Sequence, residues 1–151
     1  PITMAIQAEN QIRELAFQRP HEAYLIECHG DVADLLVGPG GETAHGLEER
    51  LNAPVYIRVH SGERDQLYIS GGRIDETEAK IGWVQRDEVI KILPRDCSES
   101  ETNQMVAIID GMMIGLPDAA RVQQRGAQIV VTEVHRSLAF AEFVQPGKRS
   151  K

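Results

Sequence analysis

The sequence predicts an α+β fold in which a strand–helix–loop–helix–strand unit is followed by a small antiparallel β-barrel. In the first half, two apolar, strand-like runs enclose two short helical patterns, and Gly38-Pro39-Gly40-Gly41 separates these patterns. In the second half, several short apolar runs are separated by turn residues, which is typical of small barrels. We therefore expect an N-terminal helix within 1–22, the first unit over 23–80, the barrel over 81–145 and a basic disordered tail over 146–151.

The chain begins with an amphipathic helical pattern over residues 5–19. Ile6, Ile12 and Leu15 fall on one side of it, and Pro20 ends it. We expect a helix that packs on the following unit, and a linker helix to an upstream domain is the alternative.

The next unit is predicted from local signals between residues 24 and 59. A strand over 24–28 and a helix over 32–37 lead to the glycine-rich break, which cannot continue a helix. A second helix, from 42 to about 51, restarts with an acid in its first turn and buries two leucines. A β-branched and aromatic strand over 55–59 completes the unit.

This arrangement resembles the KH domain, a module that binds RNA and single-stranded DNA through a G-x-x-G loop between two helices. In this sequence the loop is Gly38-Pro39-Gly40-Gly41. Glycines leave the peptide N–H groups bare, so that they can approach phosphates closely. The helix that follows adds the positive end of its dipole. The resemblance implies that this loop contacts the RNA backbone. Arg58, in the last strand, either neutralises a phosphate or simply solubilises the sheet edge.

The second half begins after a charged, turn-rich stretch over 75–82, where we place the domain junction near residue 80. The Asp110-Gly111 pair predicts a tight hairpin turn. Before the junction we expect a polar turn over 61–65 and a strand within 66–74. After it we expect a strand over 89–93, an acidic loop over 96–103 and hairpin strands over 105–109 and 112–116. A loop over 117–125 and a long β run over 126–144 complete the second half.

The stretches VAIIDGMMIGLP and GAQIVVTEVHRSLAFAEFV resemble a TRAM domain, a small OB-like barrel that binds RNA beside a catalytic or guide domain. The matching residues are Asp110, Gly111, Pro117, Val131, Val134, Arg136, Ala139 and Ala141. Arg136 lies between a strand and two alanines, and we expect it to contact RNA. Arg121 and Arg125 are further candidate RNA contacts, although a solvated surface is the alternative for them and for Lys91.

The order of a KH-like and a TRAM-like part is similar to the C-terminal extension of some bacterial ribonucleases of the E/G family, over about residues 23–144. The resemblance implies an RNA-handling region, because the family's cleavage centre uses paired aspartates and a divalent metal. We find no such pair in this sequence. A PIN-domain nuclease or an ATPase that carries KH or TRAM modules is the alternative parent.

The composition excludes several classes of protein. The net charge of −7 argues against a general polyanion-binding surface, and 5% aromatic residues cannot supply large stacking platforms. No apolar stretch approaches 18 residues, so we expect no membrane association. The two cysteines form no C-x-x-C pair, which is typical of reduced cytoplasmic proteins. The five histidines are scattered, so that we expect no metal, no cofactor and no catalytic residue.

Two functional hypotheses remain. In the first, the region binds single-stranded RNA and positions it for the other domains of a nuclease. In the second, the same fold has lost nucleic-acid affinity and acts as a protein-interaction module. The glycine loop and the barrel arginines favour the first hypothesis, whereas the acidic net charge and Glu42, directly after the loop, favour the second.

Overall fold

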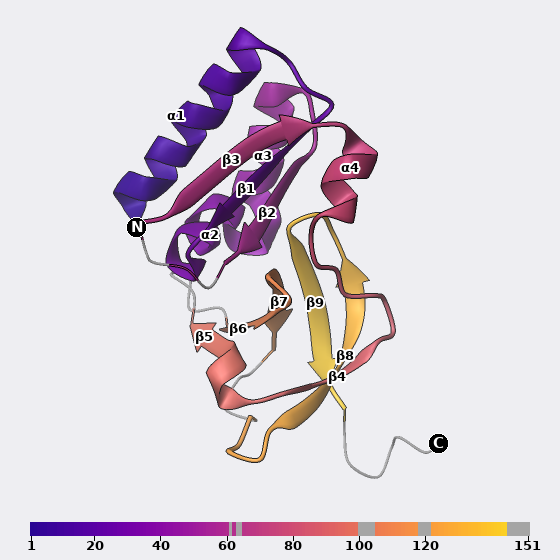
Figure 1. Cartoon of the computed structure of the whole chain (residues 1–151). Coiled ribbons are helices and arrows are strands. Elements are labelled where there is room, and N and C mark those ends of the chain that lie inside the picture. Colours follow the sequence, from indigo (N-terminus) through magenta and orange to yellow (C-terminus); the bar gives the residue numbers. More distant parts are fainter. Residues whose placement is uncertain (61, 63–64, 100–104, 118–121, 145–151) are drawn as a thin grey trace.

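The computed structural model describes residues 1–60, 62, 65–99, 105–117 and 122–144, and it has the predicted α+β composition (Figure 1). Its elements are α1 (Ile2–Gln18), β1 (Ala23–Cys28), α2 (Gly30–Val37), the 3-10 turn η1 (Pro39–Gly41), α3 (Glu42–Leu51), β2 (Val55–Val59), β3 (Leu67–Gly72), α4 (Ile74–Ala79), β4 (Val89–Ile92), the 3-10 turn η2 (Pro94–Asp96), β5 (Cys97–Glu99), β6 (Met105–Ile109), β7 (Met112–Leu116), β8 (Ala127–Val134) and β9 (Leu138–Phe143).

The first half forms a three-stranded sheet in the order β2-β1-β3. Strands β1 and β2 are parallel, and α2 and α3 make the crossover that parallel neighbours require. Strand β3 is antiparallel to β1. Buried side chains from the three helices pack with alternate residues of the central strand, including Ile12, Leu36, Leu47 and Ile26. Helix α1 lies along β3 (Figure 1) and packs through Ala5, Ala8 and Ile12, whereas Ile6, which we expected on the same side, is exposed.

The second half is one six-stranded sheet in the order β4-β8-β9-β7-β6-β5. Its two outermost strands, β4 and β5, are neighbours in sequence and are separated only by η2, so the sheet curls into a half-barrel. The β6–β7 hairpin turns at Asp110 and Gly111, whose φ angles of 53° and 81° are those of a two-residue hairpin turn.

The second sheet differs from the antiparallel barrel that we expected in one pairing. Strands β7 and β9 run parallel, because the chain crosses from β7 to β8 and then returns as β9 between them. Two connections also differ from the expectation. The charged stretch after residue 73 forms helix α4, and part of the acidic loop, Cys97–Glu99, forms β5 by pairing with β6. The predicted tail over 146–151 lies outside the described residues.

The two sheets meet along the outer edge of β2. The Val59 N–H donates to the Gly111 carbonyl at 2.8 Å, and the Ile57 N–H donates to the Ser137 hydroxyl at 2.9 Å. The same hydroxyl donates to the Val55 carbonyl at 3.2 Å. Side chains of β6, β7 and β9 join the buried cluster of helices α1–α3. The second half therefore supplies hydrogen-bond partners and buried side chains to the first, and the boundary near residue 80 stays a prediction.

Candidate nucleic-acid interface

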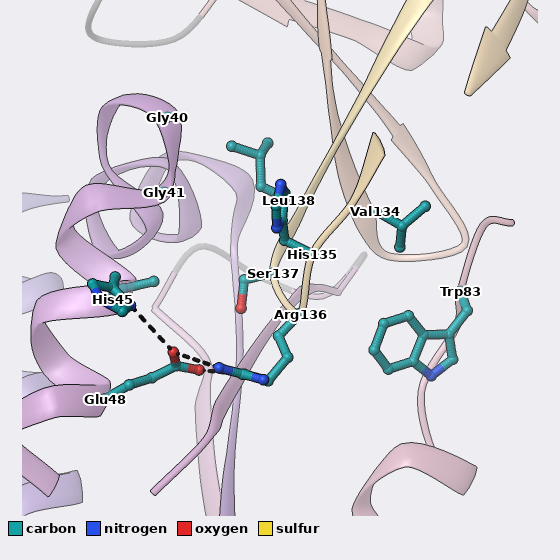
Figure 2. A pocket seen from close by; sticks show the side chains of 11 residues that line it. Gly40, Gly41, His45, Glu48, Trp83, Val134, His135, Arg136, Ser137 and Leu138 are labelled. Atoms are coloured by element: carbon teal, nitrogen blue, oxygen red, sulfur yellow. Dashed lines mark hydrogen bonds and ion pairs between the residues drawn. The ribbon is translucent and has the colours of Figure 1, made fainter. Parts of the chain in front are cut away.

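A pocket of about 500 Å³ lies between the glycine loop and the turn that joins β8 to β9 (Figure 2). One wall is the start of α3, the other is the β8–β9 turn, and Trp83 borders the turn side. The lining residues are Gly40, Gly41, Ala44, His45, Glu48, Trp83, Val134, His135, Arg136, Ser137 and Leu138. The pocket therefore combines residues from both halves of the chain.

The glycine loop has a conformation that glycine adopts without strain. Gly38, Gly40 and Gly41 have φ angles of 75°, 59° and 85°, which side chains disfavour. A Cβ on Gly38 would lie 2.1 Å from the Thr43 hydroxyl oxygen, whereas a Cβ on Gly40 would meet nothing within 4 Å. The loop is therefore a tight turn whose outer side is open at Gly40, and it delivers the chain directly into α3.

Helix α3 presents a small and polar stripe to the pocket. Ala44 and His45 come three and four residues after the N-cap residue Gly41, and Glu48 comes four and three residues after them, which places the set on one face. No side chain caps the N-terminus of this helix. The start of α3 therefore combines low side-chain bulk with a helix N-terminus that no side chain caps and with the positive end of the helix dipole.

Arg136 crosses the pocket from the β8–β9 turn to Glu48 on α3 (Figure 2). Its Nε donates to Glu48 Oε2 at 2.6 Å, and its Nη2 donates to Glu48 Oε1 at 2.9 Å. The Val55 N–H also donates to Glu48 Oε2, at 2.9 Å. The Arg136 side chain is 48% exposed, and that of Glu48 is 13% exposed. The pocket therefore holds a cation and an anion that already neutralise each other.

The pKa values of this pair shift in the directions that the hydrogen bonds require. Burial alone would raise the pKa of Glu48, but the hydrogen bonds from Arg136 and from the Val55 N–H lower it below its usual value of 4.5. The same bond to Glu48 raises the pKa of Arg136, against a smaller opposing effect of burial. Both groups are consequently ionised at neutral pH.

Arg58 has a different position from either of those expected for it. Its side chain is buried, with 3% exposure, rather than solvated or turned toward a bound phosphate. Its Nε donates to the Gly82 carbonyl at 3.0 Å, and its Nη1 donates to the carbonyls of Ile57 and Arg136 at 3.0 and 2.6 Å. The guanidinium also lies over the Trp83 ring, 4.7 Å from its centroid. Burial lowers the pKa of Arg58 to about 10. Arg58 thus joins the two halves, and we remove it from the interface.

The other predicted residues are only partly brought together. Gly38 and Pro39 border a second hollow of about 250 Å³, which Leu138 and Phe140 also line. Arg125 is exposed in the turn before β8 and does not line the main pocket. Arg121 lies outside the described residues. The structure therefore gathers Gly40, Gly41 and Arg136 in one pocket, with Gly38 and Pro39 beside it.

Sequence reasoning missed several residues of the pocket. His45 and Glu48 lie four and seven residues after Gly41. In the predicted helix this spacing places them on the same face as Gly41, so the sequence could have indicated them. The contribution of Trp83 and Ser137 had no sequence signal, because they reach the pocket through tertiary packing. His45 and His135 are exposed at its rim and lie near acids of their own segments.

Two features are absent from the residues that the structure describes. No group of three or more His, Cys, Asp or Glu side chains there is arranged to hold a metal ion. No helix in that part of the chain is both long and apolar enough to cross a membrane. Comparisons with protein-family models, with curated proteins and with solved structures found no match.

Proposed function

We propose that this region binds single-stranded RNA as a non-catalytic part of an RNA-processing protein. One observation carries the proposal: Gly40 and Gly41 of the glycine loop and Arg136 were expected from the sequence to contact RNA, and they line one pocket although they come from opposite halves of the chain. The element order β1-α2-η1-α3-β2 supports a KH-like reading of the first half. A sheet that curls through β4, η2 and β5 supports an OB-type reading of the second.

The pocket offers the groups that an RNA backbone requires. The uncapped start of α3 and the Arg136 guanidinium are donors to phosphate oxygens. Trp83 and the apolar side chains of Val134 and Leu138 supply contacts for an unpaired base or sugar. A volume of about 500 Å³ suits an unpaired nucleotide, whereas a duplex is far too wide to enter.

The charge of the chain limits the affinity that we expect. With a net charge of −7 and a pocket cation that is already paired, binding is expected to be weak and local rather than spread over a basic surface. We propose a cytoplasmic parent of the ribonuclease E/G type, in which this region positions RNA for a separate nuclease domain. Catalysis is assigned to that domain.

A protein-interaction module is the second candidate function. It is favoured by the apolar side chains that α1 exposes, since Ile2, Ile6 and Phe17 are 65%, 57% and 91% exposed. Such residues would contact another domain or subunit of the parent protein.

A salt titration of RNA binding separates the two candidates. Fluorescence anisotropy of a labelled single-stranded RNA of about 12 nucleotides is measured from low to moderate salt, with a duplex of the same length as control. The RNA-binding proposal expects saturable binding of the single strand, weaker binding of the duplex, and a log–log salt slope equivalent to two or more phosphates, at roughly 0.7 per phosphate. Absence of binding at the lowest salt would favour the interaction module.

A further inference from the structure

The cation of the pocket, Arg136, is paired with an anion of the same chain. Glu48 accepts two hydrogen bonds from the Nε and Nη2 edge of Arg136. This two-point geometry is the one that arginine also uses for phosphate oxygens. Because Glu48 fills that edge, only Nη1 and the outer hydrogen of Nη2 are directed elsewhere.

We propose that Arg136 is a phosphate-binding residue of the pocket and that Glu48 is its built-in competitor. The proposal rests on the proposed function, and it specifies how the same site is regulated. A backbone phosphate of single-stranded RNA competes with the Glu48 carboxylate for the Arg136 guanidinium, so one anion replaces another. The pocket therefore discriminates against weak anionic ligands, because each must compete with a carboxylate that is already in place.

Glu48 is fixed in its position independently of Arg136. It extends from α3, and the Val55 N–H donates to the same oxygen, Oε2, that accepts from Arg136 Nε. Loss of the arginine therefore leaves the carboxylate with a backbone donor inside the fold. Arg136, in contrast, is about half exposed and lies on a turn, so its side chain is free to move from the Glu48 carboxylate to a phosphate bound in the pocket.

The turn itself stays in place during this exchange. The Arg136 carbonyl accepts from buried Arg58, and the neighbouring Ser137 hydroxyl bonds to both Ile57 and Val55 on the edge of β2. These contacts involve the backbone of Arg136 and the side chain of Ser137. Only the Arg136 side chain has to change partner, which makes the exchange local.

The change Glu48→Gln tests the competition with little change in shape. The amide keeps an oxygen for the Val55 N–H and removes the negative charge that repels a phosphate. For like charges a few ångströms apart near a surface, removing one charge corresponds to roughly a threefold to thirtyfold gain in RNA affinity. Glu49→Gln is the matched control, because it removes the same charge from the next position, which is exposed and does not line the pocket.

The experiment measures single-stranded RNA binding against salt for the unaltered chain, Glu48→Gln, Glu49→Gln, Arg136→Gln and the double variant Glu48→Gln/Arg136→Gln. We expect Glu48→Gln to bind RNA roughly threefold to thirtyfold more tightly, with a salt slope steeper by about 0.7, one extra single-strand phosphate. Glu49→Gln should stay within about twofold, because its exposed charge is screened. Arg136→Gln should bind more weakly, and the double variant should match it, because the gain requires the guanidinium.

Two results would overturn the inference while the proposed function stands. In the first, the unaltered chain binds RNA and Glu48→Gln binds it with the same affinity. In the second, the double variant keeps the gain in RNA affinity that Glu48→Gln shows. Absence of RNA binding by every folded variant overturns both proposals. Thermal melts establish that each variant is folded. If Glu48→Gln does not fold, the unaltered chain gives the answer by NMR: the Arg136 Nε–H signal must shift when RNA is added, and an unmoved signal under saturating RNA refutes the exchange.

Discussion

Arg136 in the β8–β9 turn and Glu48 on α3 form a two-point ion pair, with distances of 2.6 and 2.9 Å, although 88 positions separate them in the sequence. The pair joins the two halves of the chain across the candidate pocket, and it neutralises the cation that we propose as a phosphate-binding residue. Contacts between this turn and β2 hold the pair in place. The Ile57 N–H of β2 donates to the Ser137 hydroxyl, and Arg58 of β2 donates to the Arg136 carbonyl.

Replacement of Arg58 by alanine should destabilise the fold strongly. The change removes a buried guanidinium that serves the carbonyls of Gly82, Ile57 and Arg136 and that lies over Trp83. We expect a loss of about 2–4 kcal/mol in the free energy of unfolding, measured by urea titration. The exposed Arg125→Ala should change it by less than about 0.5 kcal/mol. An equal loss of unfolding free energy in the two variants would show that the contacts of Arg58 between the two halves do not stabilise the fold.

The buried hydroxyl of Ser137 should contribute more to the free energy of unfolding than an exposed hydroxyl does. Ser137→Ala leaves the Ile57 N–H and the Val55 carbonyl without their partner at the edge of β2, so we expect a loss of about 1–3 kcal/mol. Thr132→Ala is the control, because its hydroxyl bonds the Phe140 carbonyl on an exposed surface. Thermal melting of both variants makes the comparison, and a similar melting temperature for the two would contradict the buried bridge.

Glu48 should make the stability of the protein dependent on acid pH. Its pKa in the folded state is lowered, chiefly by hydrogen bonds that outweigh its burial, so the ionised carboxylate stabilises the fold above the ordinary value of 4.5. This contribution is fully present at neutral pH and is lost as the pH falls through the folded-state pKa. Urea midpoints between pH 7 and pH 3 should therefore fall less in Glu48→Gln than in the unaltered chain. Glu49→Gln should keep the original pH dependence, and parallel curves for all three proteins would contradict the assignment.

The double change Pro39-Gly40→Asp-Asp should weaken RNA binding without unfolding the protein. A Cβ on Gly40 meets no atom within 4 Å, and aspartate tolerates a positive φ better than most residues. Each new carboxylate repels a nearby phosphate, and we expect roughly a tenfold to hundredfold loss of affinity. Anisotropy titrations measure the loss, with circular dichroism as the folding control. A folded variant with full affinity would show that the loop only connects two helices.

Cys28 should be unreactive in the folded protein. Its side chain is fully buried on β1, and burial, with a smaller effect of Glu27, raises the pKa of the thiol to about 12. Iodoacetamide at pH 8 should therefore modify Cys28 only after unfolding, and mass spectrometry of peptides reports the site. Rapid modification of Cys28 under native conditions would show that β1 opens readily.

Local sequence signals alone were sufficient for many of the secondary-structure elements. The predicted helix over 42–51 and the strand over 55–59 coincide with α3 and β2, because glycines, a first-turn acid and β-branched residues act within a few positions. The same holds for the hairpin at Asp110-Gly111, where the turn residues determine the pairing of β6 with β7. The glycine loop and Arg136 were chosen as candidate site residues from sequence motifs that resemble those of KH and TRAM domains.

Only the tertiary structure decided what surrounds those residues. The ion pair of Arg136 with Glu48, the burial of Arg58 and the parallel pairing of β7 with β9 depend on contacts between segments that are distant in the sequence. No local pattern encodes them, because arginine has the same helix and strand preferences whether it is exposed, paired or buried. The outcome depends on which carbonyl and carboxylate acceptors the packed sheets bring within about 3 Å of the guanidinium, the distance that a hydrogen bond requires.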